Sequence, residues 1–251
     1  MTDLLWWEVA ALIFAGFAAG IVNVMAGGGS ILTVPLMMFL GVPGPVANGT
    51  NRISVIANSV SAMAVYLRHG VPHVKLCTTL TLIAIPPALL GAWLSTRLNN
   101  DQFEGLLAVV MVAVLLIMQA PQGKSADTNE DQPKNLLLGH LLMAIAGFWG
   151  GFIQIGMGFV MLPIMHRVLG LSLVSTNILK VFIIFAYTLL AVFVFAATSE
   201  VLWVIGAIAA LGNIAGGIIG AQLTLTRGEA LIRKVLTFAI IGMVIKLVFF
   251  S

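Results

Sequence analysis

The sequence predicts an all-α polytopic membrane protein made of two inverted repeats, each a glycine-broken helical hairpin plus three transmembrane helices. Three observations lead to this fold class: the composition, two glycine breaks in apolar segments, and a likeness between the two halves. Of the 251 residues, 60% are hydrophobic and only 8% are charged, and the mean hydropathy is +1.10. A soluble domain is usually about a quarter charged, so this chain has too little charge for a water-facing surface.

The rest of the composition excludes several classes of protein. The 12 Lys and Arg residues outnumber the 9 Asp and Glu residues, but they do not gather in a basic patch, so nucleic-acid binding is not expected. Cys77 is the only cysteine, which excludes a disulfide scaffold. No Cys-x-x-Cys, His-Glu-x-x-His or histidine cluster indicates a metal. We therefore expect no metal, no cofactor and no enzymatic activity.

The transmembrane helices are predicted from length, since a bilayer-spanning helix needs about 20 mostly apolar residues. The predicted spans are 5–26, 46–68, 76–98, 103–120, 136–156, 172–198, 201–222 and 230–249. The first span is expected to be retained, because a cleavable signal peptide begins with basic residues and the first Lys or Arg here is Arg52.

Two further apolar segments, 30–41 and 157–169, are too short to span a bilayer. The first follows Gly27-Gly28-Gly29 and contains Pro35, and the second follows Gly156-Met-Gly158 and contains Pro163. Glycine and proline interrupt helices, and an interrupted backbone at membrane depth is tolerated only where it is buried in protein or lines a polar cavity. Close helix packing through small residues would explain one such cluster. Two matching breaks favour a cavity.

The hydrophilic linker 121–135 divides the chain into a first transmembrane repeat, 1–120, and a second, 136–251. The halves resemble each other at an offset of 128 to 129 residues: Pro35 matches Pro163, and Asn48 matches Asn177. The order of these matches is kept along the whole half, which indicates an internal duplication.

Orientation follows from the basic residues. If each broken segment made one net crossing, the ten Lys and Arg residues outside the membrane would divide five to five. If each break instead makes a hairpin that returns to its side of entry, they divide eight to two. Three full crossings per half then invert one repeat relative to the other. This predicts a cytoplasmic linker and N- and C-termini outside the membrane.

Two cations are predicted to lie within the membrane, Arg52 in 46–68 and Lys180 in 172–198, at matching places in the two repeats. A cation at membrane depth costs about 2.5–3.5 kcal/mol even on lenient scales unless something compensates it. No Asp or Glu lies deep in any predicted span. Since neither cation has an evident protein partner, a mobile anion is the expected one.

Polar groups around the two cations and the two breaks complete the predicted anion site. A broken segment also offers free backbone N–H groups where its short helix begins, and these attract anions. The predicted site residues are Asn23, Gly28, Gly29, Ser30, Asn48, Thr50, Asn51, Arg52, Gln154, Gly156, Gly158, Thr176, Asn177 and Lys180.

Each of these residue types also has a plainer interpretation. Arg52 or Lys180 alone could extend its charged end to the membrane surface. Asn and Ser side chains often only bond neighbouring helices together, which is our expectation for Asn58, Ser59 and Ser61. Two cations at equivalent repeat positions, with no buried acid, favour a functional role.

The run Gly20-Ile-Val-Asn23-Val-Met-Ala-Gly27-Gly28-Gly29-Ser30-x4-Pro35, followed by Asn48-Gly-Thr-Asn-Arg52, resembles the first-repeat signature of the sulfite exporter TauE/SafE family, also called the 4-toluene sulfonate uptake permease family. The resemblance covers essentially the whole chain, with a weaker second copy around Gly156-Met-Gly158-x4-Pro163 that lacks the fuller glycine run of the family. It implies a multi-spanning protein of the bacterial inner membrane that moves sulfite, a sulfonate or sulfoacetate.

The expected function is therefore secondary transport of a small sulfur-containing anion, bound near the midplane between the repeats and moved by alternating access. A passive anion channel would use the same site but needs a continuous pore and weak binding. A non-transporting membrane assembly protein is the third alternative, although the longest predicted loop is only 121–135. The expected partners are the anion and the lipid bilayer, and the protein is a monomer or a homodimer.

Overall fold

The computed structural model describes the backbone of residues 4–119 and 131–249 and the side chains of residues 4–110, 131–227 and 231. All regular elements of this described part are helices. They are α1 (Trp6–Met25), α2 (Ser30–Phe39), α3 (Gly44–His69), α4 (Val74–Ser95), α5 (Asn100–Gln119), α6 (Leu136–Phe152), α7 (Met157–Pro163), the π-helix η1 (Ile164–Val168), α8 (Leu173–Thr198) and α9 (Trp203–Phe249). Most of the predicted linker, 121–130, lies outside the described residues.

Both predicted glycine breaks are confirmed as interruptions between a long helix and a short one. The first separates α1 from α2, and the second separates α6 from α7. Pro35 lies inside α2, and Pro163 ends α7, where the backbone continues as η1. A π-helical turn of this kind is rare and is frequent at functional sites.

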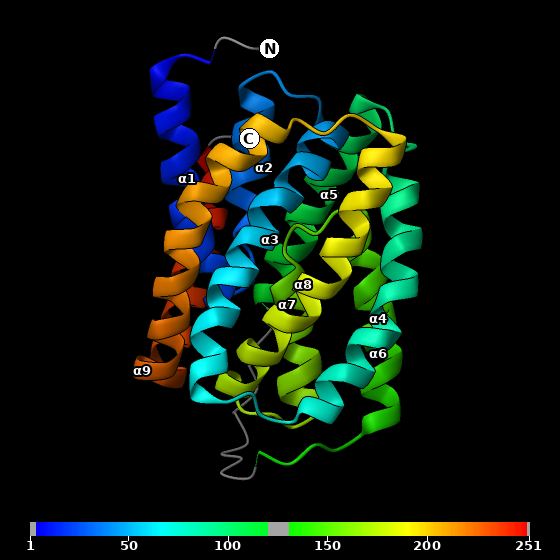
Figure 1. Cartoon of the computed structure of the whole chain (residues 1–251), viewed down its shortest axis with the longest axis vertical. Coiled ribbons are helices and arrows are strands. Elements are labelled where there is room, and N and C mark those ends of the chain that lie inside the picture. The colour runs from blue at the N-terminus through cyan, green and yellow to red at the C-terminus, as the bar shows by residue number, and fades with distance from the viewer. Residues whose placement is uncertain (1–3, 120–130, 250–251) are drawn as a thin grey trace.

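The path of the chain shows what each break does (Figure 1). α1 runs down from the upper end of the view and α2 returns to that end, whereas α6 enters from the lower end and α7 and η1 return to it. Each interrupted segment therefore ends on the side where it began. The two hairpins approach each other from opposite ends of the molecule.

Small residues let the long helices pack closely around these hairpins. α1 and α3 lie along α9, and α6 and α8 lie along α4. A Cβ atom at Gly212 of α9 would come within 1.9 Å of the Ile13 carbonyl oxygen of α1, and one at Gly151 of α6 within 1.8 Å of the Ala88 oxygen of α4. Membrane helices associate through such close backbone contacts, because lipid offers no hydrophobic drive between them.

Four described segments are long and apolar enough to cross a membrane: Trp6–Met25, Val74–Ser95, Leu173–Thr198 and Trp203–Arg227. α3 has the length but is too rich in polar residues to qualify, and α6 is shorter than its predicted span because the chain leaves the helix after Phe152. Most side chains of 103–120 and all but one of 230–249 lie outside the described set.

The predicted spans 201–222 and 230–249 both lie within α9, and the structure has helix instead of a loop between them. Figure 1 shows the orange first part of α9 descending the molecule and its red end behind α1 toward the upper end, so the chain reverses direction within this stretch. No proline stands there, and the hydroxyls of Thr224 and Thr226 donate hydrogen bonds to the carbonyls of Gly220 and Gln222 at 2.9 and 2.8 Å. Such bonds to the preceding turn satisfy threonine within a helix.

Candidate functional site

The two breaks meet in the interior of the molecule. The Gly158 backbone N–H donates a hydrogen bond to the Gly27 carbonyl oxygen at 2.9 Å. Gly27 has a φ of +80°, and a Cβ atom there would lie 2.1 Å from the Gly158 Cα. Both the positive φ and the close backbone approach require glycine. Segments 131 residues apart (158 − 27) are thus held in direct contact.

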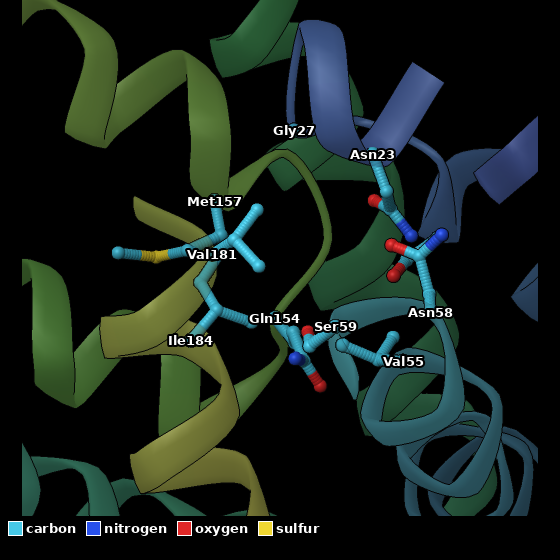
Figure 2. Close-up of a pocket in the computed structure, with 10 residues that line it drawn as sticks. Asn23, Gly27, Val55, Asn58, Ser59, Gln154, Met157, Val181 and Ile184 are labelled. Carbon is cyan, nitrogen blue, oxygen red and sulfur yellow. The ribbon is translucent and has the colours of Figure 1, made fainter. Parts of the chain in front are cut away.

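A small cavity lies beside this contact (Figure 2). Its lining residues are Asn23, Gly27, Ser30, Val55, Asn58, Ser59, Gln154, Met157, Val181 and Ile184. In the close-up, the amide groups of Asn23 and Asn58 face each other on one side, and Met157, Val181 and Ile184 form the other. About 20 Å³ is open to the centre of a water molecule, which is room for one or a few waters.

The first break is closed by its own side chains. The Asn23 Oδ1 accepts a hydrogen bond from the Gly29 N–H at 2.8 Å, which satisfies a free donor where α2 begins. Behind it, the Asn51 Nδ2 donates to the Ser30 Oγ at 3.0 Å, and the Thr33 hydroxyl donates to the Asn51 Oδ1 at 2.6 Å. Asn51 therefore connects α3 to the short helix α2.

The second break is held differently. Gln154 has a φ of +58°, a left-handed conformation that is costly for a residue other than glycine, asparagine or aspartate. Its Nε2 donates to the Thr188 hydroxyl of α8 at 2.9 Å, and its Oε1 has no hydrogen-bond partner although the residue is only 4% exposed. Since Gln154 lines the cavity, an unpaired polar atom is available to a bound molecule there.

Lys180 is fully buried in α8, and its ammonium group contacts the end of α1. Its Nζ donates to the Val24 carbonyl oxygen at 2.9 Å and to the Asn177 Oδ1 at 2.5 Å. Val24 belongs to the last turn of α1, just before the first break. A cation in this position interacts favourably with the negative end of the helix dipole.

Arg52 is fully buried in α3, and its guanidinium contacts the end of α6. Its Nη1 donates to the Gly150 carbonyl at 3.3 Å, its Nη2 donates to the Gly151 carbonyl, and its Cζ lies 4.5 Å from the centre of the Phe195 ring. One turn before it, the Asn48 Nδ2 donates to the Phe152 carbonyl at 2.9 Å and to the Ser95 hydroxyl at 3.0 Å. α3 thus supplies donors to three carbonyls at the end of α6.

These contacts correct one premise of the sequence analysis. Both cations do have protein partners, but the partners are helix-end carbonyl oxygens instead of carboxylates. The sequence shows where Asp and Glu residues stand, but it does not show which backbone carbonyl oxygen will contact a cation. Within the described residues the one ion pair is His73 with Asp131, at 3.4 Å. The charges of Arg52 and Lys180 therefore have no counter-ion in that part of the chain.

The cavity lining contains Asn23, Ser30 and Gln154 among the predicted site residues. Gly28, Gly29, Gly156 and Gly158 form the backbone of the breaks, while Arg52 and Lys180 do not reach the cavity surface.

Three other predicted site residues lie away from the cavity lining. Thr50 accepts a hydrogen bond from the Leu202 N–H at 3.0 Å and so fixes the start of α9. The Thr176 hydroxyl and the Asn177 Nδ2 are buried without a hydrogen-bond partner.

Two residues that we expected only to join helices also line the cavity, namely Asn58 and Ser59. Asn58 does join helices, since its Nδ2 donates to the carbonyls of Gly20 and Asn213 at 3.1 and 3.0 Å. The signal that sequence reasoning overlooked is helical spacing: Asn51, Val55 and Asn58 recur at four and three residues and so share one face of α3.

A charged cluster lies away from the cavity, where the linker meets α8. The Ser172 N–H and the Ser175 hydroxyl donate to the Asp131 carboxylate at 2.8 and 2.5 Å, and His73 lies beside it. Partial burial raises the pKa of the Asp131 carboxyl, but the hydrogen bonds from Ser175 and Ser172 and the contact with His73 outweigh it, so the pKa lies below its usual value. Asp131 therefore places a negative charge at the N-terminal end of α8, whose N-cap residue is Ser172.

Comparison with known proteins finds relatives that are named probable membrane transporters. The chain is 27% identical to the "Probable membrane transporter protein ORF9" of a Sinorhizobium species over 98% of this chain and 95% of the relative. It is 25% identical to a "Probable membrane transporter protein" of Haemophilus influenzae over 96% of this chain and 94% of the relative. No solved structure matches the chain. The model of the family described as "Sulfite exporter TauE/SafE" matches residues 12–247, so the chain belongs to the sulfite exporter TauE/SafE family.

Proposed function

We propose that this protein is a secondary transporter that moves a small sulfur-containing anion, such as sulfite, a sulfonate or sulfoacetate, across the bacterial inner membrane by alternating access. The observation that carries the proposal is the meeting of two interrupted helices at a buried polar cavity, in a chain of a membrane transporter family. Transporters bind substrate between interrupted helices near the bilayer midplane. The substrate class comes from the family description and from the positive charge around the cavity.

The electrostatics of the site favour an anion. Arg52 is buried against the end of α6 and Lys180 against the end of α1, and neither has a carboxylate partner among the described residues. α2 also begins at the cavity, at Ser30, and the N-terminal end of a helix carries a partial positive charge. The cavity wall itself adds amide and hydroxyl groups but no acid.

Inverted repeats remain part of this proposal. The two hairpins enter from opposite ends of the molecule, and α1 lies along α9 as α6 lies along α4. If α1 corresponds to α6 and α4 to the first part of α9, each hairpin packs on the corresponding helix of the other half. On this arrangement the linker is cytoplasmic and both termini are periplasmic.

The size of the cavity indicates a closed state. Its open space suits water and is small for a sulfur oxyanion. Transport therefore requires the hairpins to separate from α3 and α8, first on one side of the membrane and then on the other. A passive channel would instead need a continuous pore.

The direct test is a flux assay in proteoliposomes with sulfite, an alkyl sulfonate, sulfate and chloride. We expect saturable uptake of a sulfur-containing anion, and at least about a tenfold loss of flux in Gln154→Met and Ser59→Ala, because each removes a polar group from the cavity wall. Gln222→Met is the matched control, since Gln222 is exposed on α9. Flux that is unsaturable or equal for chloride would favour a channel, and unchanged flux in both cavity variants would contradict the site.

The topology has its own test. A cysteine placed at Ser125, in a Cys77→Ala background, is expected to react with a membrane-impermeant maleimide only from the cytoplasmic side. Labelling from the periplasmic side would contradict the inverted arrangement without affecting the assignment of the cavity.

A further inference from the structure

We infer that Arg52 and Lys180 are positioning residues, each of which caps the interrupted helix in the other half of the chain and thereby holds the break that borders the cavity. Their link to transport depends on the function proposed above. The capping itself depends only on hydrogen bonds between the halves.

The need for a cap arises where α1 and α6 stop. The last four carbonyls of a helix have no partner within it, and an end buried in a membrane protein has no bulk water to satisfy them. The Val22 carbonyl accepts from the N–H groups of Ala26 and Gly27, and the Trp149 carbonyl accepts from those of Ile153 and Gln154. The later carbonyls of both helices need donors from elsewhere.

Neither helix supplies its own cap. A Lys, Arg or His in the last turn is a common way to satisfy helix-end carbonyls, yet the last turns of α1 and α6 contain none. In both cases a cation arrives from the other half of the chain. Lys180 of α8 donates to Val24 of α1, and Arg52 of α3 donates to Gly150 and Gly151 of α6.

The two caps are equivalent in sequence as well as in space. Arg52 and Lys180 are 128 residues apart (180 − 52), which is the offset between the two halves. An asparagine accompanies each: Asn177 accepts from Lys180 at 2.5 Å, and Asn48 donates to the Phe152 carbonyl at 2.9 Å. The exchange is reciprocal, because each half holds the broken helix of the other.

This geometry separates the two cations from direct contact with a molecule in the cavity. The lining includes Gln154, which lies in the second break, and Ser30, which follows the first, but neither cation. Removal of either charge should therefore loosen a break and impair the movement of its hairpin. It should leave the cavity groups that contact the anion in place.

Hydrogen–deuterium exchange measured by mass spectrometry tests the caps without any substrate. In Lys180→Met we expect at least about tenfold faster exchange in the peptide covering residues 22–30, with 148–158 unchanged. In Arg52→Met the pattern should reverse. Arg97→Gln is the control, because Arg97 is an exposed cation that stacks on Trp93 at 4.8 Å and contacts neither break. Exchange that is unchanged, or faster only in the half that carries the substitution, would overturn the inference.

Transport measurements then distinguish a positioning residue from an anion ligand. For sulfite, we expect the maximal flux of Lys180→Gln to fall at least about tenfold, which is a larger factor than the rise in Kd caused by the lost positive charge, and Lys180→Arg to restore part of the flux. A Kd that rises about tenfold or more with unchanged exchange at 22–30 would make Lys180 a ligand instead.

The two proposals fail in different ways. If the wild-type protein binds and moves none of the tested anions, the proposed function is contradicted. Faster hydrogen–deuterium exchange at the break in the half opposite to each substitution would still support the caps. If a neutral variant does not fold, Lys180→Arg and Arg52→Lys give the same readout: capping predicts slow exchange at the opposite break, and fast exchange there would contradict it.

Discussion

The two interrupted hairpins perform the same turn by different means. The first uses glycine where the backbone is left-handed, at Gly27, and satisfies the start of α2 with the Asn23 side chain. The second has Gly156 in the left-handed region but also places Gln154 there, continues through a helix of 7 residues, and passes into a π-helical turn. The first break is thus locally relaxed, whereas the second holds unfavourable conformations at the cavity.

Strain of this kind persists only where the surrounding structure maintains it, and it gathers at functional sites. The strained residue here is also the one whose side chain has an unpaired oxygen and lines the cavity. The comparison therefore indicates that the first hairpin is the more rigid support and that the second carries the adaptable part of the site.

The largest expected effect comes from the contact that both hairpins share. Gly27→Ala should lower the free energy of unfolding by about 3 kcal/mol or more, because the Cβ clashes with Gly158 and φ is positive. Thermal unfolding in detergent measures it. Gly70→Ala measures a conformational cost without a clash, since Gly70 has a φ of +88° and a ψ of 143°, a region open essentially to glycine alone, but no atom within 4 Å; it should cost about 1–3 kcal/mol. Equal losses in the two variants would show that the hairpins do not touch.

The strain at the second break is measured by comparing Gln154→Gly with Gln154→Ala. Both remove the bond to Thr188, but only glycine adopts the left-handed conformation freely. We expect the glycine variant to be more stable than the alanine variant by about 1–2 kcal/mol, with flux low in both. An alanine variant as stable as the glycine variant would remove the distinction between the hairpins.

A smaller effect is expected at the first break. Asn23→Ala should cost about 1 kcal/mol in unfolding free energy, because the Gly29 N–H loses its acceptor. Asn23→Asp keeps an acceptor there and should recover most of the stability. If the alanine variant unfolds at the wild-type temperature, the first hairpin is not held by this bond.

The smallest effect concerns the starts of α3 and α8. The Gly44 N–H of α3 donates to the neutral Asn100 Oδ1 at 2.8 Å, whereas the Ser172 N–H at the start of α8 donates to the charged Asp131 carboxylate at 2.8 Å. Because the folded pKa of Asp131 lies below its ordinary value of 3.8, its contribution is present above that pH and is lost as the pH falls through the folded pKa. Asp131→Asn should therefore cost under about 1 kcal/mol at neutral pH and nothing at strongly acid pH.

Unfolding of Asp131→Asn and Asn100→Ala across a pH series measures this difference. The loss in the Asn100 variant should not vary with the protonation of Asp131, because its bond to Gly44 involves a neutral amide. A loss in Asp131→Asn that persists at strongly acid pH would exclude the charge as its cause.

Much of the framework was predictable from local sequence. Length and hydropathy placed the helices, and the glycine clusters placed both breaks to within a few residues. The loop expected between the predicted spans 201–222 and 230–249 is absent, because the structure has helix throughout this stretch. Hydropathy reports burial in lipid, and it does not report whether backbone hydrogen bonds continue through a polar turn.

The candidate site was only partly predictable. Asn23, Ser30 and Gln154 were identified because they border the breaks in sequence. Asn58 and Ser59 were assigned to helix packing, and the partners of Arg52 and Lys180 were sought among acids. Those partners are backbone carbonyls from the other half of the chain, and every residue has a carbonyl, so no residue type marks them.

The sequence by itself determined that this chain spans a membrane, that it contains two matched breaks, and that two cations lie inside without acidic partners nearby. These three properties follow from composition and from the spacing of residues that are close together in the sequence. Only the tertiary structure decided that the breaks touch at Gly27 and Gly158, that a small cavity lies beside them, and that each cation reaches the opposite half. Contacts between segments about 100 residues or more apart depend on how the long helices pack, and that packing is a property of the whole fold.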